Sequence, residues 1–257
     1  MNTQTEPFIR LQNVKKIYGS GANQHLAVSD VTLDINAGEL ISIVGPSGCG
    51  KSTVLMILAG LISHEDGEVN IGNQGTPFDE NRDIGMVFQQ DLLLKWRTVI
   101  DNILLPAELL GLPVKESRDR ALDLINLVGL DGYENKYPKQ LSGGQRQRVS
   151  IARSLIHDPK LILMDEPFGA LDALTREKMN LELLRIWEKS QKTILFVTHG
   201  ISEAVLLGSR VAVLTAGPAR MAANIPIDLP YPRTLEMKTH EEFGAYCREI
   251  YDLLGMH

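Results

Sequence analysis

The feature that most constrains this chain is a glycine-rich loop between a short apolar run and a helical pattern. Residues 45–53 read Gly-Pro-Ser-Gly-Cys-Gly-Lys-Ser-Thr, which fits the pattern G-x-x-x-x-G-K-[ST]. The apolar run 41–44 before the loop is typical of a buried strand, and apolar residues recur at helical spacing over 54–58 after it. Strand, glycine loop and helix form the context in which this pattern binds phosphate.

The loop predicts a phosphate site that is formed largely by the backbone. Its glycines let N–H groups turn toward phosphate oxygens, and the N-terminus of the following helix adds a partial positive charge. Lys51 is placed to reach the β- and γ-phosphates, and the Ser52 hydroxyl to contact Mg²⁺. The alternative is an ordinary glycine-rich turn, which the motifs downstream disfavour. The expected phosphate-binding residues are Gly45, Pro46, Ser47, Gly48, Cys49, Gly50, Lys51, Ser52 and Thr53.

Two adjacent carboxylates follow a second apolar run. Residues 161–164 are typical of a buried strand, and Asp165 and Glu166 come directly after it. Adjacent strand residues point to opposite faces, so the two carboxylates need not share a task. One could hold the Mg²⁺ shell while the other faces an attacking water. The alternative is a polar turn, which would leave the phosphate loop without a carboxylate for its metal.

The order and spacing of these motifs resemble the ABC-type ATPases, the nucleotide-binding subunits of ATP-binding cassette transporters, along nearly the whole chain. The resemblance implies an α/β P-loop NTPase core with a mixed sheet, a small antiparallel β subdomain and a helical subdomain. Residues 1–257 would form a single ABC ATPase domain. Its core with the β subdomain would comprise 1–88 and 158–230, the helical subdomain 89–157, and a short helical tail 231–257.

The resemblance also implies roles for single residues. Tyr18 matches the aromatic residue that stacks on adenine, and Gln89 matches the glutamine that contacts Mg²⁺ and water and senses the membrane partner. Glu166 matches the general base, and His199 matches the histidine that contacts the γ-phosphate. The plainer alternatives are a strand-end aromatic for Tyr18, a solvated amide for Gln89 and a hydrogen-bonded histidine for His199. The expected catalytic residues are Glu166, His199, Gln89 and Lys51, and the expected metal ligands are Ser52, Gln89 and Asp165.

Residues 141–145, Leu-Ser-Gly-Gly-Gln, match the family's signature. Ser142 can cap the helix that follows, and the glycines leave backbone N–H groups free for an anion. The resemblance implies that this site, Ser142, Gly143, Gly144 and Gln145, closes over the ATP of a second copy of the chain. Two ATP molecules would then lie in a head-to-tail dimer, with the loop 169–172 crossing its interface. Loss of the γ-phosphate contact on hydrolysis would open the dimer.

Two segments narrow the resemblance to importer ATPases of the nitrate, sulfonate and taurine group: 94–99, Leu-Lys-Trp-Arg-Thr-Val, and 165–172. The partners implied are transmembrane permease subunits and, indirectly, an extracytoplasmic solute-binding protein, with the chain at the cytoplasmic face of the membrane. Trp96 would lie near the groove that receives the permease or would pack between lobes. The substrate stays open among nitrate, an alkanesulfonate, taurine and a vitamin precursor. Gly200 departs from the family's usual aspartate, and we expect a more permissive loop after His199.

Composition excludes several classes of protein. The 257 residues are 44% apolar and 23% charged, as in soluble globular proteins, and no run approaches 18 apolar residues. The polar start without a leader and the two cysteines favour a reducing cytosol over secretion or a zinc site. A net charge of −6 with mixed signs disfavours nucleic acid as a partner. Two alternatives remain: an ABC-type ATPase acting on nucleic acid or ribosomes, and an ATP-binding scaffold without turnover, which Glu166 and His199 disfavour.

The expected elements follow from periodicity and turn residues. Strands 8–14, 26–35 and 67–71 would form the small antiparallel sheet. Between 89 and 157 we expect helices, one of them interrupted by Pro106 and stopped by Gly111 and Pro113, and a terminal helix over 240–254. The resemblance implies that larger relatives carry a regulatory barrel after the core, and we expect none in the short stretch after residue 215. The expected core strands are 41–44, 84–87, 161–164, 193–197 and 211–215.

Overall fold

The structure, a computed structural model, describes residues 6–72 and 77–255. The polar start of the chain, which we expected to lack a leader, falls almost entirely outside these residues. The described strands form one sheet of nine in the order β4-β1-β2-β9-β8-β3-β7-β6-β5. The strands are β1 Ile9–Tyr18, β2 His25–Ile35, β3 Leu40–Val44, β4 Asp66–Ile71, β5 Ile84–Val87, β6 Leu161–Asp165, β7 Thr193–Val197, β8 Arg210–Leu214 and β9 Ala219–Pro226.

The strands β8, β3, β7, β6 and β5 run parallel, and all the residues of β3 and β7 are buried. In β6, Ile162 and Met164 pack into one hydrophobic cluster while Leu161 and Leu163 pack into another. This alternation places the two clusters on opposite faces of the sheet. Burial on both faces explains why these strands appear in the sequence as unbroken apolar runs.

The antiparallel strands β1, β2 and β4 confirm the expected small sheet, with one difference. It does not stand beside the main sheet but is continuous with it, because β9 pairs with β2 through Val28 and Ala219 and with β8 along its length. Strand β9 was not predicted from the sequence, because its side chains alternate between buried and exposed and few of them are large and apolar. Strand β1 also extends beyond the expected 8–14, and its Lys16 pairs with Glu65 at 2.9 Å.

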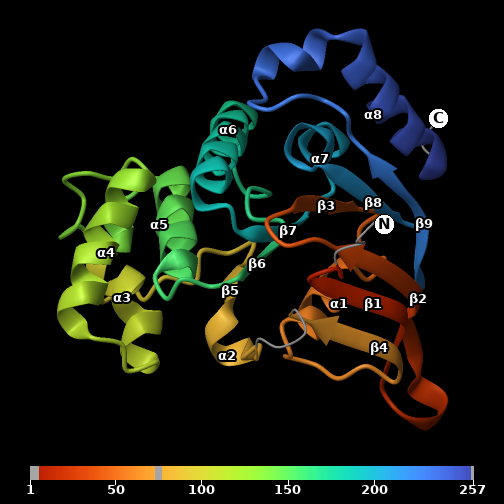
Figure 1. The fold of residues 1–257 in the computed structure, drawn as a ribbon, viewed down its shortest axis with the longest axis horizontal. Coiled ribbons are helices and arrows are strands. Elements are labelled where there is room, and N and C mark those ends of the chain that lie inside the picture. The colour runs from red at the N-terminus through yellow and green to blue at the C-terminus, as the bar shows by residue number, and fades with distance from the viewer. Residues whose placement is uncertain (1–5, 73–76, 256–257) are drawn as a thin grey trace.

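Helices α3, α4 and α5 form a group at one side of the sheet, while α6 and α7 lie over one face of it and α8 packs against α7 (Figure 1). Pro106 does not interrupt α3, contrary to expectation. A proline inside a helix costs one hydrogen bond, about 3 kcal/mol, but Ile103 and Ala107 on either side of it are buried in the core. The helices are α1 Lys51–Leu58, α2 Glu80–Asp83, α3 Val99–Leu109, α4 Val114–Leu127, α5 Gly143–Leu155, α6 Ala173–Ser190, α7 Ile201–Leu207 and α8 Glu241–Leu253.

The fold class is therefore the one expected, an α/β mixed sheet with an antiparallel portion and a group of helices. Helix α8 confirms the expected terminal helix to within one residue at each end. Among the described residues, no helix is both long enough and apolar enough to span a bilayer.

Candidate functional site

Four adjacent parallel strands end at one edge of the sheet, and each is followed by a residue with a predicted role. The glycine loop follows β3, His199 follows β7, Glu166 follows β6 and Gln89 follows β5. Open α/β sheets bind ligands at the carboxyl ends of their strands. The sheet order therefore brings together residues that lie more than 100 positions apart in the sequence.

The glycine loop has the conformation that its composition requires. Gly50, directly before α1, has φ +111°, and a Cβ there would lie 2.7 Å from the carbonyl oxygen of Ala27. Only glycine fits this left-handed, crowded position. A Cβ on Gly45 would lie 2.8 Å from Cys49 Sγ. The loop is thus folded tightly against β2 and its own thiol.

Lys51 is held inside the loop. Its side chain is 5% exposed, and Nζ donates to the carbonyl oxygens of Gly45 at 2.8 Å and Pro46 at 3.0 Å. Glu166 Oε1 lies 3.9 Å from the same nitrogen. The ammonium is therefore oriented by neutral carbonyls and has a single, loosely placed carboxylate nearby.

The two carboxylates after β6 have different partners. Asp165 accepts a hydrogen bond from Ser52 Oγ at 3.0 Å, and burial together with the neighbouring Glu166 charge raises the pKa of Asp165. Glu166 leaves the strand with φ +44°, and its Oε2 lies 3.1 Å from His199 Nδ1, which donates in the tautomer protonated there. The two carboxylates therefore have different neighbours, and their separate tasks stay a prediction.

The loop after His199 is tied to α7. The Thr198 hydroxyl accepts from the Gly200 N–H at 2.9 Å and donates to the buried Glu203 carboxylate. Gly200 has φ −87°, a value that any residue adopts, and it begins α7 without a side-chain cap. The backbone at Gly200 therefore does not adopt a conformation that requires glycine. Gln89 also lies near this group, because its Nε2 is 3.2 Å from the position that a Cβ on Gly169 would occupy.

A cavity of about 260 Å³ opens over the loop. Three residues of the loop, Gly45, Pro46 and Cys49, do not line it. The carbonyl oxygens of Gly45 and Pro46 instead bind Lys51, and burial raises the pKa of the Cys49 thiol, which keeps it protonated. His25 and Ala27 line the cavity, although the sequence analysis gave them no role. The pairing of the two strands on either side of the turn 19–24 could have indicated them, because it places His25 opposite Tyr18. The lining residues are Tyr18, His25, Ala27, Ser47, Gly48, Gly50, Lys51, Ser52, Thr53 and Glu166.

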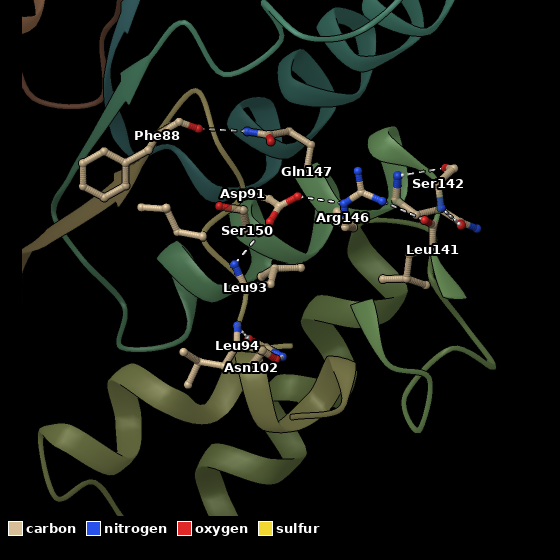
Figure 2. Close-up of polar contacts among 12 residues, drawn as sticks. Phe88, Asp91, Leu93, Leu94, Asn102, Leu141, Ser142, Arg146, Gln147 and Ser150 are labelled. Atoms are coloured by element: carbon tan, nitrogen blue, oxygen red, sulfur yellow. Dashed lines mark hydrogen bonds and ion pairs between the residues drawn. The ribbon is translucent and has the colours of Figure 1, made fainter. Parts of the chain in front are cut away.

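The signature residues lie elsewhere and do not line this cavity. Ser142 caps α5 as expected: its Oγ accepts from Gln145 N at 3.3 Å, and Gln145 Oε1 accepts from Ser142 N at 2.9 Å (Figure 2). This capping box satisfies two backbone donors at the start of the helix. The N–H groups of Gly143 and Gly144, in the first turn of α5, have no acceptor within the helix.

Comparison with known proteins identifies the family. Residues 28–169 match the ABC transporter family. The chain belongs to this family, and it is an ATPase that couples ATP hydrolysis to transport. An uncharacterized ABC transporter ATP-binding protein of Methanocaldococcus jannaschii is 44% identical over 96% of this chain and 91% of its own length.

Two further relatives have more specific names. The taurine import ATP-binding protein TauB of Roseobacter denitrificans is 44% identical over 89% of this chain and 86% of its own. The aliphatic sulfonates import ATP-binding protein SsuB of Bacillus cereus is 40% identical over 94% of both chains. A bacterial ABC transporter cassette solved as a dimer is 38% identical with a TM-score of 0.73, covering 86% of this chain and 100% of its own. The same cassette in a post-hydrolysis state with ADP and Pi gives the same TM-score at 36% identity.

Proposed function

We propose that this chain is the ATP-hydrolysing subunit of an ABC importer, and that it dimerises around two ATP molecules to drive a separate membrane permease. The observation that carries the proposal is the convergence of three pairs at one edge of the sheet. Lys51 lies within the glycine loop, Ser52 is bonded to Asp165, and Glu166 lies against His199. Phosphoryl transfer to water requires a loop that binds the phosphates, oxygen ligands for a metal ion and a base for the attacking water. The three pairs supply these parts, with a histidine beside the base.

The residues present fit a magnesium nucleotide. The Ser52 hydroxyl and the Asp165 carboxylate are 3.0 Å apart, and hard oxygen donors of this kind suit Mg²⁺. Burial and the neighbouring Glu166 charge raise the pKa of Asp165, and a bound divalent cation would lower it. When bound, Mg²⁺ would neutralise charge on the β- and γ-phosphates. We assign Ser52, Asp165 and Gln89 to this ion.

The chemistry assigned to the chain's own residues is base catalysis. Glu166 would accept the proton of the attacking water on a carboxylate oxygen, and His199 would orient that carboxylate through the 3.1 Å contact. Lys51 would contact the transferred phosphate with an ammonium already oriented by two carbonyls. Tyr18, which is 38% exposed at the rim of the cavity, would offer its ring to the adenine.

The size of the cavity supports a second copy of the chain as a partner. Sites that enclose a whole drug-sized ligand usually measure about 300–1,000 Å³, whereas this cavity measures about 260 Å³. The cavity formed by one chain is therefore smaller than the sites that usually enclose a whole ligand of this size. The N–H groups of Gly143, which is exposed, and of Gly144, which is buried, do not face the cavity of their own chain and would complete the site of the partner.

The permease contact is best placed between β5 and the end of α3. Leu92, Trp96 and Leu109 are 50%, 74% and 79% exposed there, and Leu109 also lines a cavity of about 400 Å³ against β5. We place the chain at the cytoplasmic face of the membrane, where ATP is available. The names of the relatives favour a small sulfonate such as taurine as the transported solute, with nitrate and related anions as alternatives.

The experiment replaces the base while leaving its shape. Glu166→Gln should lower steady ATP turnover by about 10²- to 10⁴-fold, the usual contribution of a general base. Nucleotide affinity should change little, because the phosphate cradle is untouched. With millimolar ATP this variant should migrate as a dimer in size-exclusion chromatography.

A second substitution separates binding from closure. Ser142→Arg in the Glu166→Gln background should retain nucleotide binding and abolish the dimer, while Ser63→Arg, at an exposed position of a loop, should retain both. A variant Glu166→Gln that stays monomeric with ATP and still turns over would refute the assigned roles.

A further inference from the structure

The segment that follows Gln89 is bonded directly to the signature helix. Arg146, in the first turn of α5, donates from Nε to Asp91 Oδ2 at 2.8 Å, and the same guanidinium donates from Nη1 to the carbonyl oxygen of Leu141 at 2.9 Å (Figure 2). Asp91 lies two residues after Gln89, and Leu141 lies immediately before Ser142. One guanidinium thus bridges the segment 88–94 and the backbone that leads into the signature.

Further bonds join the same two elements. Arg153, two turns along α5, donates to the carbonyl oxygens of Asp91 at 2.8 Å and Leu92 at 2.9 Å. Gln147 Nε2 contacts the carbonyl oxygen of Phe88 at 3.4 Å, and Asp91 Oδ1 accepts from Leu93 N at 3.2 Å. The segment 88–94 therefore lies along α5 over about two turns of helix. It cannot shift along the helix without breaking several charge-assisted bonds.

We propose that the Asp91–Arg146 ion pair is a positioning element that sets the signature for closure over the partner's nucleotide. The inference rests on the proposed function, because it requires that the signature closes on a second copy. Leu92 and Trp96, the exposed apolar residues of this region, lie one and five residues beyond Asp91. A partner that moves them displaces Asp91 and, through Arg146, the carbonyl of Leu141.

The pair is a partly exposed contact rather than a bond of the core. Its side chains are 36% exposed for Arg146 and 29% exposed for Asp91. Partly exposed pairs of this kind contribute little to global stability. Their removal is therefore expected to affect the placement of the signature more than the unfolding of the chain.

The test is a double-mutant cycle in the Glu166→Gln background of the full chain. Asp91→Asn and Arg146→Gln should each weaken ATP-dependent dimerisation about fivefold, and the double variant should be no weaker than either single variant, because contacting residues are coupled. Affinity of the monomer for a fluorescent ATP analogue, measured at low protein concentration, should stay within about twofold, since neither residue lines the cavity. Dimerisation is measured by analytical ultracentrifugation.

A matched control contacts the other end of α5. Arg120, in α4, also bridges an aspartate and a backbone carbonyl: its Nη2 lies 2.9 Å from Asp158 Oδ1 and 3.0 Å from the carbonyl oxygen of Leu155. Arg120→Gln should leave dimerisation unchanged. The inference would be overturned if the losses of the two single variants multiplied in the double variant, or if Arg120→Gln lost as much dimerisation as they do. It would also be overturned if both single variants dimerised normally, or if the monomer lost ATP affinity in parallel. Failure of the Glu166→Gln parent to dimerise would instead contradict the proposed function.

Discussion

Asn102 anchors the segment that carries Trp96, and its removal should be among the costliest polar substitutions in the helical group. The residue is fully buried in α3, and its Oδ1 accepts from Leu94 N at 2.7 Å. Its Nδ2 lies within 3.1 Å of three carbonyl oxygens, those of Leu94, Arg97 and Thr98. Figure 2 shows the contact with Leu94 below the signature helix.

The magnitude follows from the number of bonds that the amide can make. An amide nitrogen has two protons, so its three carbonyl contacts count as two hydrogen bonds, and the accepted bond makes three. At about 1 kcal/mol each, Asn102→Ala should lower the free energy of unfolding by about 3 kcal/mol. For a chain of this size that loss corresponds to a fall in Tm of about 6–12 °C.

The assay combines thermal unfolding with amide hydrogen exchange. Exchange at residues 94–98 should accelerate more than exchange in β3 or β7, because the lost bonds are local. The matched control is Asn126→Ala, which removes one exposed contact with Asp131 Oδ1 at 2.9 Å and should cost less than about 0.5 kcal/mol. A loss below about 1 kcal/mol for Asn102→Ala, or equal losses for the two variants, would refute the reasoning.

Three further predictions concern other buried groups. Burial raises the pKa of the Glu203 carboxyl, so on raising the pH this carboxyl ionises in the unfolded chain before it ionises in the folded one. The free energy of unfolding should therefore fall as pH rises from about 4.3 to the folded pKa. Glu203→Gln should flatten that part of a curve of Tm against pH. Arg233→Met should cost about 3 kcal/mol in urea unfolding, because the guanidinium donates to carbonyls at the end of α7 and in 227–229, and Arg233→Lys should recover only a minor part. Lys51→Ala should weaken binding of a fluorescent ATP analogue at least about tenfold, while Lys189→Ala, on the exposed face of α6, should not.

The sequence predicted much of this protein, because many of its decisive features are local. The glycine loop requires a left-handed residue at Gly50, and the apolar runs before it and before Asp165 have the composition of strands buried on both faces. Ser142 and Gln145 are spaced as a capping box. Each of these patterns is complete within a few residues, so it can be recognised without knowledge of its neighbours.

The tertiary structure decided which distant residues meet. Strand β9, with few large apolar residues, is recognisable only from its pairing with β2 and β8. No sequence pattern singled out His25, Asn102 or the Asp91–Arg146 pair. The periodicity of a sequence does not indicate which distant residue a polar side chain will contact. The order of the parallel strands placed Glu166 against His199, and backbone geometry at the strand ends set the distance between them. Local patterns fix the conformation of a segment, whereas contacts across the sheet depend on how all the segments pack.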